Sequence, residues 1–331
     1  MRPIFLLLSL SLTLFAAVDG TVMNLTSGKP QAGVVVTLIQ PGAEGMKTIG
    51  TATSAADGKF VIDKDAGEAP ALLQGLFQGV TYTLILGPGQ PRTGAVLNVN
   101  SVSKRQDIVK VSQHMVVLEP TAEKLQVSET FLVSNASNET LLDPTAGSLR
   151  IVLPEGAGTA RVIIQNAIVP VQRPALETRQ KGVFKIDYPV KPGETRFDIS
   201  YTLPASTKFS GRSLYKEAPT RLVSPSAVTL SGPGISSLGQ EPTTQANIYD
   251  SKSTEYSVEI TGMGALRPAA PEAGGDESGG GGGGPEIKQI KPKLYERLYW
   301  VLGLTLAILG LGFALIYRSD AQPTVSETRK S

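Results

Sequence analysis

Cysteine is absent from the 331 residues, and histidine and tryptophan occur once each. Without cysteine the chain has no disulfide framework, no thiolate metal site, no thiol nucleophile and no lipidated cysteine. A zinc site or a Ser-His-Asp triad would depend on His114 alone. Charge of either sign is also scarce, with 31 Lys and Arg against 29 Asp and Glu. This balance gives no basic field, so nucleic acid is not an expected partner.

The remaining candidates for metal or cofactor chemistry are weak. His114 adjoins Met115, but no Cys-x-x-Cys-His haem attachment motif exists, and His114 is predicted to be a structural residue at the start of a strand. Asp57, Asp63 and Asp65 lack the spacing and the distal glutamate of a calcium loop. The sequence therefore predicts no catalytic residue, no metal and no cofactor, and hence no enzyme. A pair of carboxylates for glycoside hydrolysis stays open, because only three-dimensional separation defines it.

A long apolar run near the C-terminus is the most informative feature of the sequence. Residues 298–317 contain no charge, and twenty helical residues reach about 30 Å, the thickness of the hydrocarbon core of a bilayer. Trp300 and Tyr317 fall near its two ends, where amphipathic rings prefer the headgroups, and Arg318 stops the run. We predict a transmembrane helix over 298–317 and a cytoplasmic tail over 318–331.

Small residues recur along this predicted helix at Gly303, Ala307, Gly310 and Ala314. At 100° per residue they fall within about 60° of one another on one helix face. Either the alignment is accidental, because glycine and alanine are common in such helices, or it is a seam for a second copy or a partner helix.

The N-terminus carries a second targeting signal. Arg2 precedes an apolar run over 4–15, and small residues follow, which predicts a signal peptide over 1–19 with cleavage after Ala17 or after Gly20. The middle of the chain is then exported, and the lack of cysteine fits a bacterial envelope: the expected location is the inner membrane, with the ectodomain in the periplasm or outside the cell. The excess of basic residues before the helix argues for the opposite orientation. We give the signal peptide more weight, because long domains translocate largely regardless of charge.

The exported part shows the period-two alternation of β-strands. Phe197, Ile199 and Tyr201 alternate with polar residues, and Leu125, Val127, Phe131 and Val133 share one strand face. Residues 69–77 are the one place where a short turn of helix is expected. Residues 264–297 hold a Pro/Gly-rich linker and a basic juxtamembrane segment. The predicted fold class is all-β: two tandem β-sandwich domains at 20–112 and 113–263, then the linker and one C-terminal transmembrane helix.

The first of these domains has a recognisable order of short motifs. Asp57-Gly58 predicts a tight hairpin between strands at 51–53 and 60–62. The other motifs are Gly20-Thr21-Val22, Ala32-Gly33-Val34 and Tyr82-Thr83-Leu84. This order resembles the carboxypeptidase regulatory-like domain, a small β-sandwich of the transthyretin-like type. The resemblance implies an accessory or binding module without catalytic residues of its own. The second domain looks like a larger immunoglobulin-like sandwich, at the level of fold only.

These features favour a membrane-anchored extracytoplasmic binding or assembly module that presents β-sandwiches to a protein or carbohydrate partner. One alternative is an accessory subunit of an envelope biogenesis or transport complex, with the helix making homo- or hetero-association contacts. A less favoured alternative is an envelope hydrolase.

Overall fold

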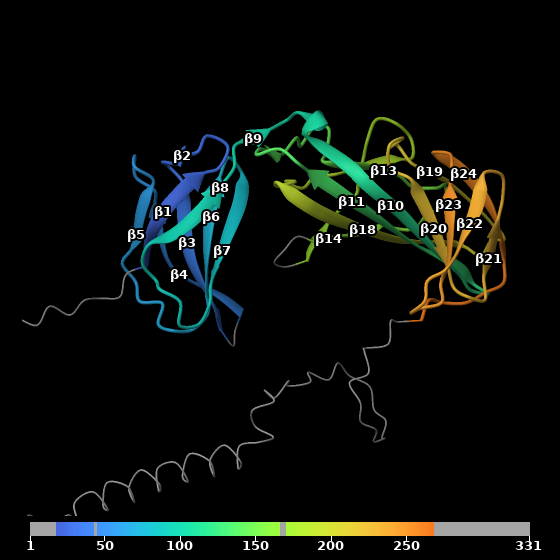
Figure 1. Ribbon diagram of the computed structural model, residues 1–331, viewed down its shortest axis with the longest axis horizontal. Helices are drawn as coiled ribbons and strands as arrows, with labels where there is room; N and C mark the ends of the chain where they lie inside the picture. The colour runs from blue at the N-terminus through green and yellow to red at the C-terminus, as the bar shows by residue number, and fades with distance from the viewer. Residues whose placement is uncertain (1–17, 43–44, 166–169, 268–331) are drawn as a thin grey trace, which may run out of the picture. The chain divides into compact units, whose positions relative to one another are not determined.

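The computed structural model describes residues 18–42, 45–165 and 170–267. These residues fold into β-strands in mostly antiparallel sheets (Figure 1), and the helical structure among them is one 3₁₀ turn, Gln106–Ile108. The prediction of an all-β fold is confirmed for this part of the chain. No helix in the described ranges is long and apolar enough to cross a bilayer. The predicted transmembrane segment 298–317, with Gly303, Ala307, Gly310 and Ala314, lies outside them.

Two four-stranded sheets enclose the first hydrophobic core of the described chain. Sheet A consists of β1 (Val18–Asn24), β2 (Lys29–Pro30), β5 (Lys59–Ile62) and β8 (Ala95–Val99). Sheet B consists of β3 (Val35–Gly42), β4 (Gly45–Thr53), β6 (Ala71–Phe77) and β7 (Val80–Leu86), in the order β4-β3-β6-β7. Alternate residues of both sheets are buried, as in a β-sandwich.

A glycine allows the closest approach in sheet A. β1 pairs with β8 in parallel, and a Cβ atom built on Gly20 would lie 2.1 Å from the carbonyl oxygen of Ala95 and 2.8 Å from the Phe60 ring. Only the absence of a side chain lets β8 and Phe60 pack there. The glycine of the Gly20-Thr21-Val22 motif is therefore required by packing.

Two local predictions in this region are wrong. Asp57-Gly58 does not join a hairpin, because β4 pairs with β3 whereas β5 pairs with β1 in the other sheet. The turn carries the chain between the sheets, with Gly58 at φ 76° and the Asp57 carboxylate accepting from the Lys59 N–H. Residues 71–77 form strand β6 and not a turn of helix, since β6 is paired on both sides. Tertiary pairing overrides local propensity here.

The second hydrophobic core is formed by an eight-stranded sheet, sheet D, and two three-stranded sheets in the described chain. Sheet D contains β10 (Val109–Pro120), β11 (Lys124–Asn135), β14 (Arg161–Gln165), β15 (Val171–Arg173), β18 (Gly193–Pro204), β20 (Thr220–Ser224), β22 (Ile235–Gln240) and β23 (Asn247–Ser251). Its order is β15-β14-β18-β11-β10-β20-β23-β22. Sheet E contains β13 (Leu149–Val152), β16 (Leu176–Glu177) and β17 (Val183–Ile186), and sheet F contains β19 (Lys208–Arg212), β21 (Thr229–Ser231) and β24 (Glu255–Thr261).

Three long strands organise sheet D. β10, β11 and β18 each have 12 residues, and β11 pairs with both of the others along its length. The predicted alternation is confirmed: Phe197, Ile199 and Tyr201 are buried, as are Leu125, Val127, Phe131 and Val133. β10 also pairs in parallel with β20, and this pair connects β15, β14, β18 and β11 on one side of sheet D to β23 and β22 on the other.

Residues after β11 return to the first core. β12 (Thr140–Leu141) pairs in parallel with β9 (Val102–Ser103), and Leu142 packs against the first core. The Tyr82 hydroxyl donates to the carbonyl of Asn100 and lies 2.8 Å from Thr140 Oγ1. The predicted boundary between the two domains, at residues 112 and 113, falls inside strand β10. All described residues fall within one compact unit, 1–272.

We expect Phe60→Ala to lower the free energy of unfolding by about 3–5 kcal/mol, because it deletes a buried ring. Val61→Ala is the matched control: its neighbouring side chain is 60% exposed, and the change should stay within about 0.5 kcal/mol. Urea unfolding followed by tyrosine fluorescence measures both. Equal losses would contradict the inner face assigned to β5.

Candidate functional site

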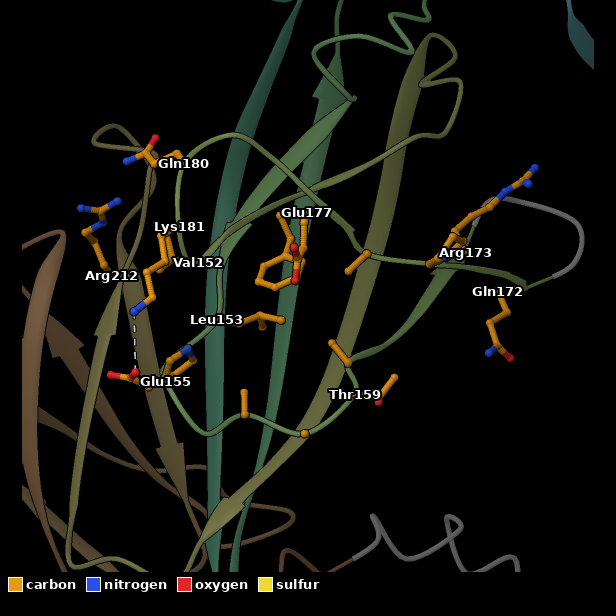
Figure 2. Close-up of a pocket in the computed structure, with 18 residues that line it drawn as sticks. Val152, Leu153, Glu155, Thr159, Gln172, Arg173, Glu177, Gln180, Lys181 and Arg212 are labelled. Atoms are coloured by element: carbon orange, nitrogen blue, oxygen red, sulfur yellow. Dashed lines mark ion pairs between the residues drawn. The ribbon is translucent and has the colours of Figure 1, made fainter.

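An open groove lies at the edge of the second core, between sheets D and E. Its volume is about 1300 Å³. Two crossings between the sheets border it: the β13–β14 loop over 153–160, and Pro174-Ala175, which connects β15 to β16. β15 and β16 are the outermost strands of their sheets within the described residues. The groove is therefore the unfilled margin of a sandwich-like pair of sheets (Figure 2).

The floor of the groove is apolar. Leu153 is 8% exposed, and Ala157, Ala160, Ala175 and Phe184 pack against the second core while lining the groove. Small side chains at this margin leave space that larger residues would fill. The floor thus offers apolar surface to a ligand without opening the core itself.

Charged side chains stand at both ends of this floor. In Figure 2, Arg212 and Lys181 lie on one side and Arg173 on the other, with Leu153 between them. Lys181 Nζ pairs with Glu155 Oε1 at 3.7 Å, and both side chains are almost fully exposed. Such a pair is worth little in water and is easily exchanged for a ligand contact.

Arg212 connects the groove to a smaller hollow of about 460 Å³ that contains Glu255 and Tyr256. Its only ion pair among the described residues is with Glu255, at 3.8 Å. Its Nε is buried and has no hydrogen-bond partner in the described chain. A guanidinium carries five N–H donors that match a carboxylate. Arg212 thus lies beside the groove with a side chain that is 38% exposed and held by one long ion pair.

The edge strands turn two charged residues inward. Arg173 is paired with buried Val162, and Glu177 with Phe184, so both side chains lie on the core-facing side of their strands. Neither has a salt-bridge partner within 4 Å among the described residues. Inward charges on edge strands discourage unwanted sheet pairing.

The single histidine is buried and does not line this groove. His114 lies within β10 and not at the start of a strand, and it is 1% exposed. Its Nε2 is 2.9 Å from Glu129 Oε2, its Nδ1 is 3.1 Å from Thr220 Oγ1, and its ring stacks on Phe131 at 4.1 Å. The arrangement has the residue types of a triad, but a substrate has no access to it. It is a structural network.

Glu129 is the residue that sequence reasoning missed. It occupies the alternating position between Val127 and Phe131 on the core face of β11, and it is 7% exposed. Tyr201 donates its hydroxyl to Glu129 Oε1 at 2.6 Å. The sequence signal was available: a carboxylate in an otherwise apolar register predicts a buried partner.

Burial and the Glu129 carboxylate act on the neighbouring tyrosines. Burial, followed by the nearby negative charge of Glu129, raises the pKa of Tyr201 far above its usual value. The same causes, in the same order, raise the pKa of Tyr256. Both phenols stay protonated at any physiological pH, so Tyr201 remains a permanent donor to Glu129.

The other residues singled out from sequence do not converge. Asp57 receives the Lys59 N–H and pairs with its ammonium, and the Asp65 carboxylate receives the Gly67 N–H. In the described ranges, no group of three His, Cys, Asp or Glu side chains is arranged to hold a metal ion. Asp57 and Asp65 thus each accept a hydrogen bond within their own turn.

No protein-family model matches the chain, and no curated protein matches it either. Among solved structures, it is similar to an M1 zinc metallopeptidase from Deinococcus radiodurans, with a TM-score of 0.26 and 14% identity over 46% of this chain and 42% of that one. It is also similar to native leukotriene A4 hydrolase from Saccharomyces cerevisiae, with a TM-score of 0.29 and 10% identity over 46% of this chain and 29% of that one. The chain thus spans less than half the length of these structures, and likenesses this weak carry no argument about activity.

We expect Glu129→Leu to cost about 3–5 kcal/mol of unfolding free energy, because it strands His114 and Tyr201 in the core without an acceptor. The triple variant Glu129→Leu, His114→Leu, Tyr201→Phe should regain most of this loss, since it removes the buried polar groups together. Exposed Glu123→Leu is the control. A triple variant no more stable than Glu129→Leu alone would show that packing, and not the unsatisfied groups, sets the cost.

Proposed function

We propose that the chain is a membrane-anchored extracytoplasmic binding module without catalysis of its own, and that the groove between sheets D and E holds its ligand. The observation that carries the proposal is the combination in that groove of an apolar floor with charged side chains at its margin, of which Arg173 and Glu177 have no salt-bridge partner among the described residues. Pockets for ligands combine apolar lining with a few polar groups that fix orientation. The partner is a protein or a carbohydrate outside the cytoplasm.

Two tandem β-sandwich domains, a linker and the anchor at 298–317 complete the proposed architecture. Two four-stranded sheets around one core are compatible with a carboxypeptidase regulatory-like first domain. Cleavage of the signal peptide after Ala17 fits β1 best, because Val18 is fully buried and pairs with Ile62. Cleavage after Gly20 would remove this part of the strand.

The location in the bacterial inner membrane can be tested by reporter fusions to the full chain. We expect alkaline phosphatase to be active when inserted after Gly275 and inactive when fused after Ser331, because the enzyme requires export. A fluorescent protein that folds only in the cytoplasm should give the opposite pattern. Phosphatase activity at the C-terminal end alone would show the inverted topology, which the excess of basic residues before the helix favours.

The groove itself can be tested by site-specific photocrosslinking in living cells. Benzoylphenylalanine replaces exposed Thr159 or Gln172 at the groove, or exposed Val61 on sheet A as the control. We expect discrete adducts from the groove positions and none from position 61. The absence of groove adducts, or the same adducts from all three positions, contradicts a ligand site here.

A further inference from the structure

We propose that the occupant of the groove is an extended polypeptide segment that adds as a further strand to the free edge of β16, with a carboxylate directed to Arg212. This inference rests on the proposed function, because it names the ligand class for the same groove. We favour a polypeptide over a carbohydrate because the main-chain N–H and C=O of one residue, Glu177, point outward from the sheet edge.

The hydrogen-bond register of β16 leaves one residue facing outward. Leu176 is paired with Lys185 and Glu177 with Phe184, and the Thr178 N–H donates to the Val183 carbonyl at 3.1 Å. Bonded and non-bonded pairs alternate in an antiparallel ladder. Because 178 and 183 are a bonded pair, Glu177 belongs to a non-bonded pair. Its N–H and C=O therefore point away from β17 toward the open edge.

An incoming strand satisfies both of these groups at once. A residue opposite Glu177 would exchange two main-chain hydrogen bonds with it, which is the recognition mode of strand addition. A sugar has no regularly spaced donor and acceptor pair of this kind. No described strand covers this edge, because β16 is outermost in sheet E.

The groove beside this edge suits alternating side chains. Successive residues of a strand point to opposite faces, so every second side chain of the peptide lies on the same face as Glu177 and is directed toward the groove. The small residues Ala157, Ala160 and Ala175 leave room for apolar groups there. Intervening side chains face solvent and carry little specificity.

Charge supplies the remaining preference. Arg173 has no salt-bridge partner among the described residues, and the 38% exposed side chain of Arg212 has only the 3.8 Å contact with Glu255. The lining holds three basic side chains, Arg173, Lys181 and Arg212, against the two carboxylates Glu155 and Glu177, and this excess of positive charge favours an acidic residue in the ligand. The competing explanation is that Arg173 and Glu177 protect the edge from pairing with any strand.

Selection from a library of random linear dodecapeptides on phage tests this directly. The target is the full chain in lipid nanodiscs, and empty nanodiscs remove non-specific phage. The most enriched peptide is synthesised with blocked ends, and its Kd is measured by fluorescence anisotropy. We expect enriched sequences with alternating apolar residues and at least one Asp or Glu.

N-methylation of single peptide bonds distinguishes strand addition from other binding. Each N-methyl group deletes one donor without changing a side chain, so affinity should fall about tenfold at alternate positions and hardly change between them. Because these changes leave the protein untouched, misfolding of a variant cannot explain them.

Matched variants of the protein give the reciprocal test. Glu177→Pro removes the outward N–H without breaking the β16–β17 ladder, and it should weaken the peptide about tenfold. Glu177→Gln keeps the N–H and should change affinity less than about threefold. Arg212→Gln should reduce the preference for acidic peptides.

Each outcome separates this inference from the proposed function. No enriched peptide, binding without a two-residue period, or binding unaffected by Glu177→Pro overturns strand addition. If groove crosslinks persist in cells while peptides fail and an oligosaccharide panel binds, the binding function stands and the polypeptide inference is wrong. If groove crosslinks are also absent, the proposed function fails with it.

Discussion

The pairing of β10 with β11 is the interaction on which the second core depends. It aligns two strands of 12 residues, and each then serves as a template on its other side: β11 for β18, and β10 for β20. The strands on either side of β10, from β15 to β22, are thereby parts of one continuous sheet. Main-chain hydrogen bonds on both sides of β10, to β11 and to β20, hold these strands in register.

The buried hydrogen-bond network lies on the four central strands of sheet D, where a shift in strand register would affect both sides of the sheet. His114 on β10, Glu129 on β11, Tyr201 on β18 and Thr220 on β20 bring side chains from four adjacent strands into one chain of hydrogen bonds. A shift of one residue would point these side chains to the opposite face. Apolar residues tolerate many arrangements, whereas a buried carboxylate with two donors accepts few. The network thus favours a single register for the four strands that it connects, β18, β11, β10 and β20.

Sequence reasoning succeeded where one physical rule decides the outcome. Alternation predicted the buried faces of β11 and β18, because a strand with one face in water must place its apolar residues at every second position. It failed at Asp57-Gly58, since turn residues specify a reversal but not which sheet receives the next strand. It missed the groove, because nothing in the sequence indicates that Arg173 and Glu177, which are 4 residues apart, lie on edge strands of two different sheets. It also missed Glu129, although the residue interrupts an apolar face.

The parallel pairing of β10 with β20 also has a consequence for the order in which the chain folds. His114 and Thr220 are 106 residues apart, so the contact closes a long loop, and long-range closure slows folding. Until β20 arrives, the outer edge of β10 remains open to other chains in an unfinished molecule. The period between completion of the β10–β11 hairpin and docking of β20 is therefore when this protein is most vulnerable to aggregation, and when a folding helper has most to protect.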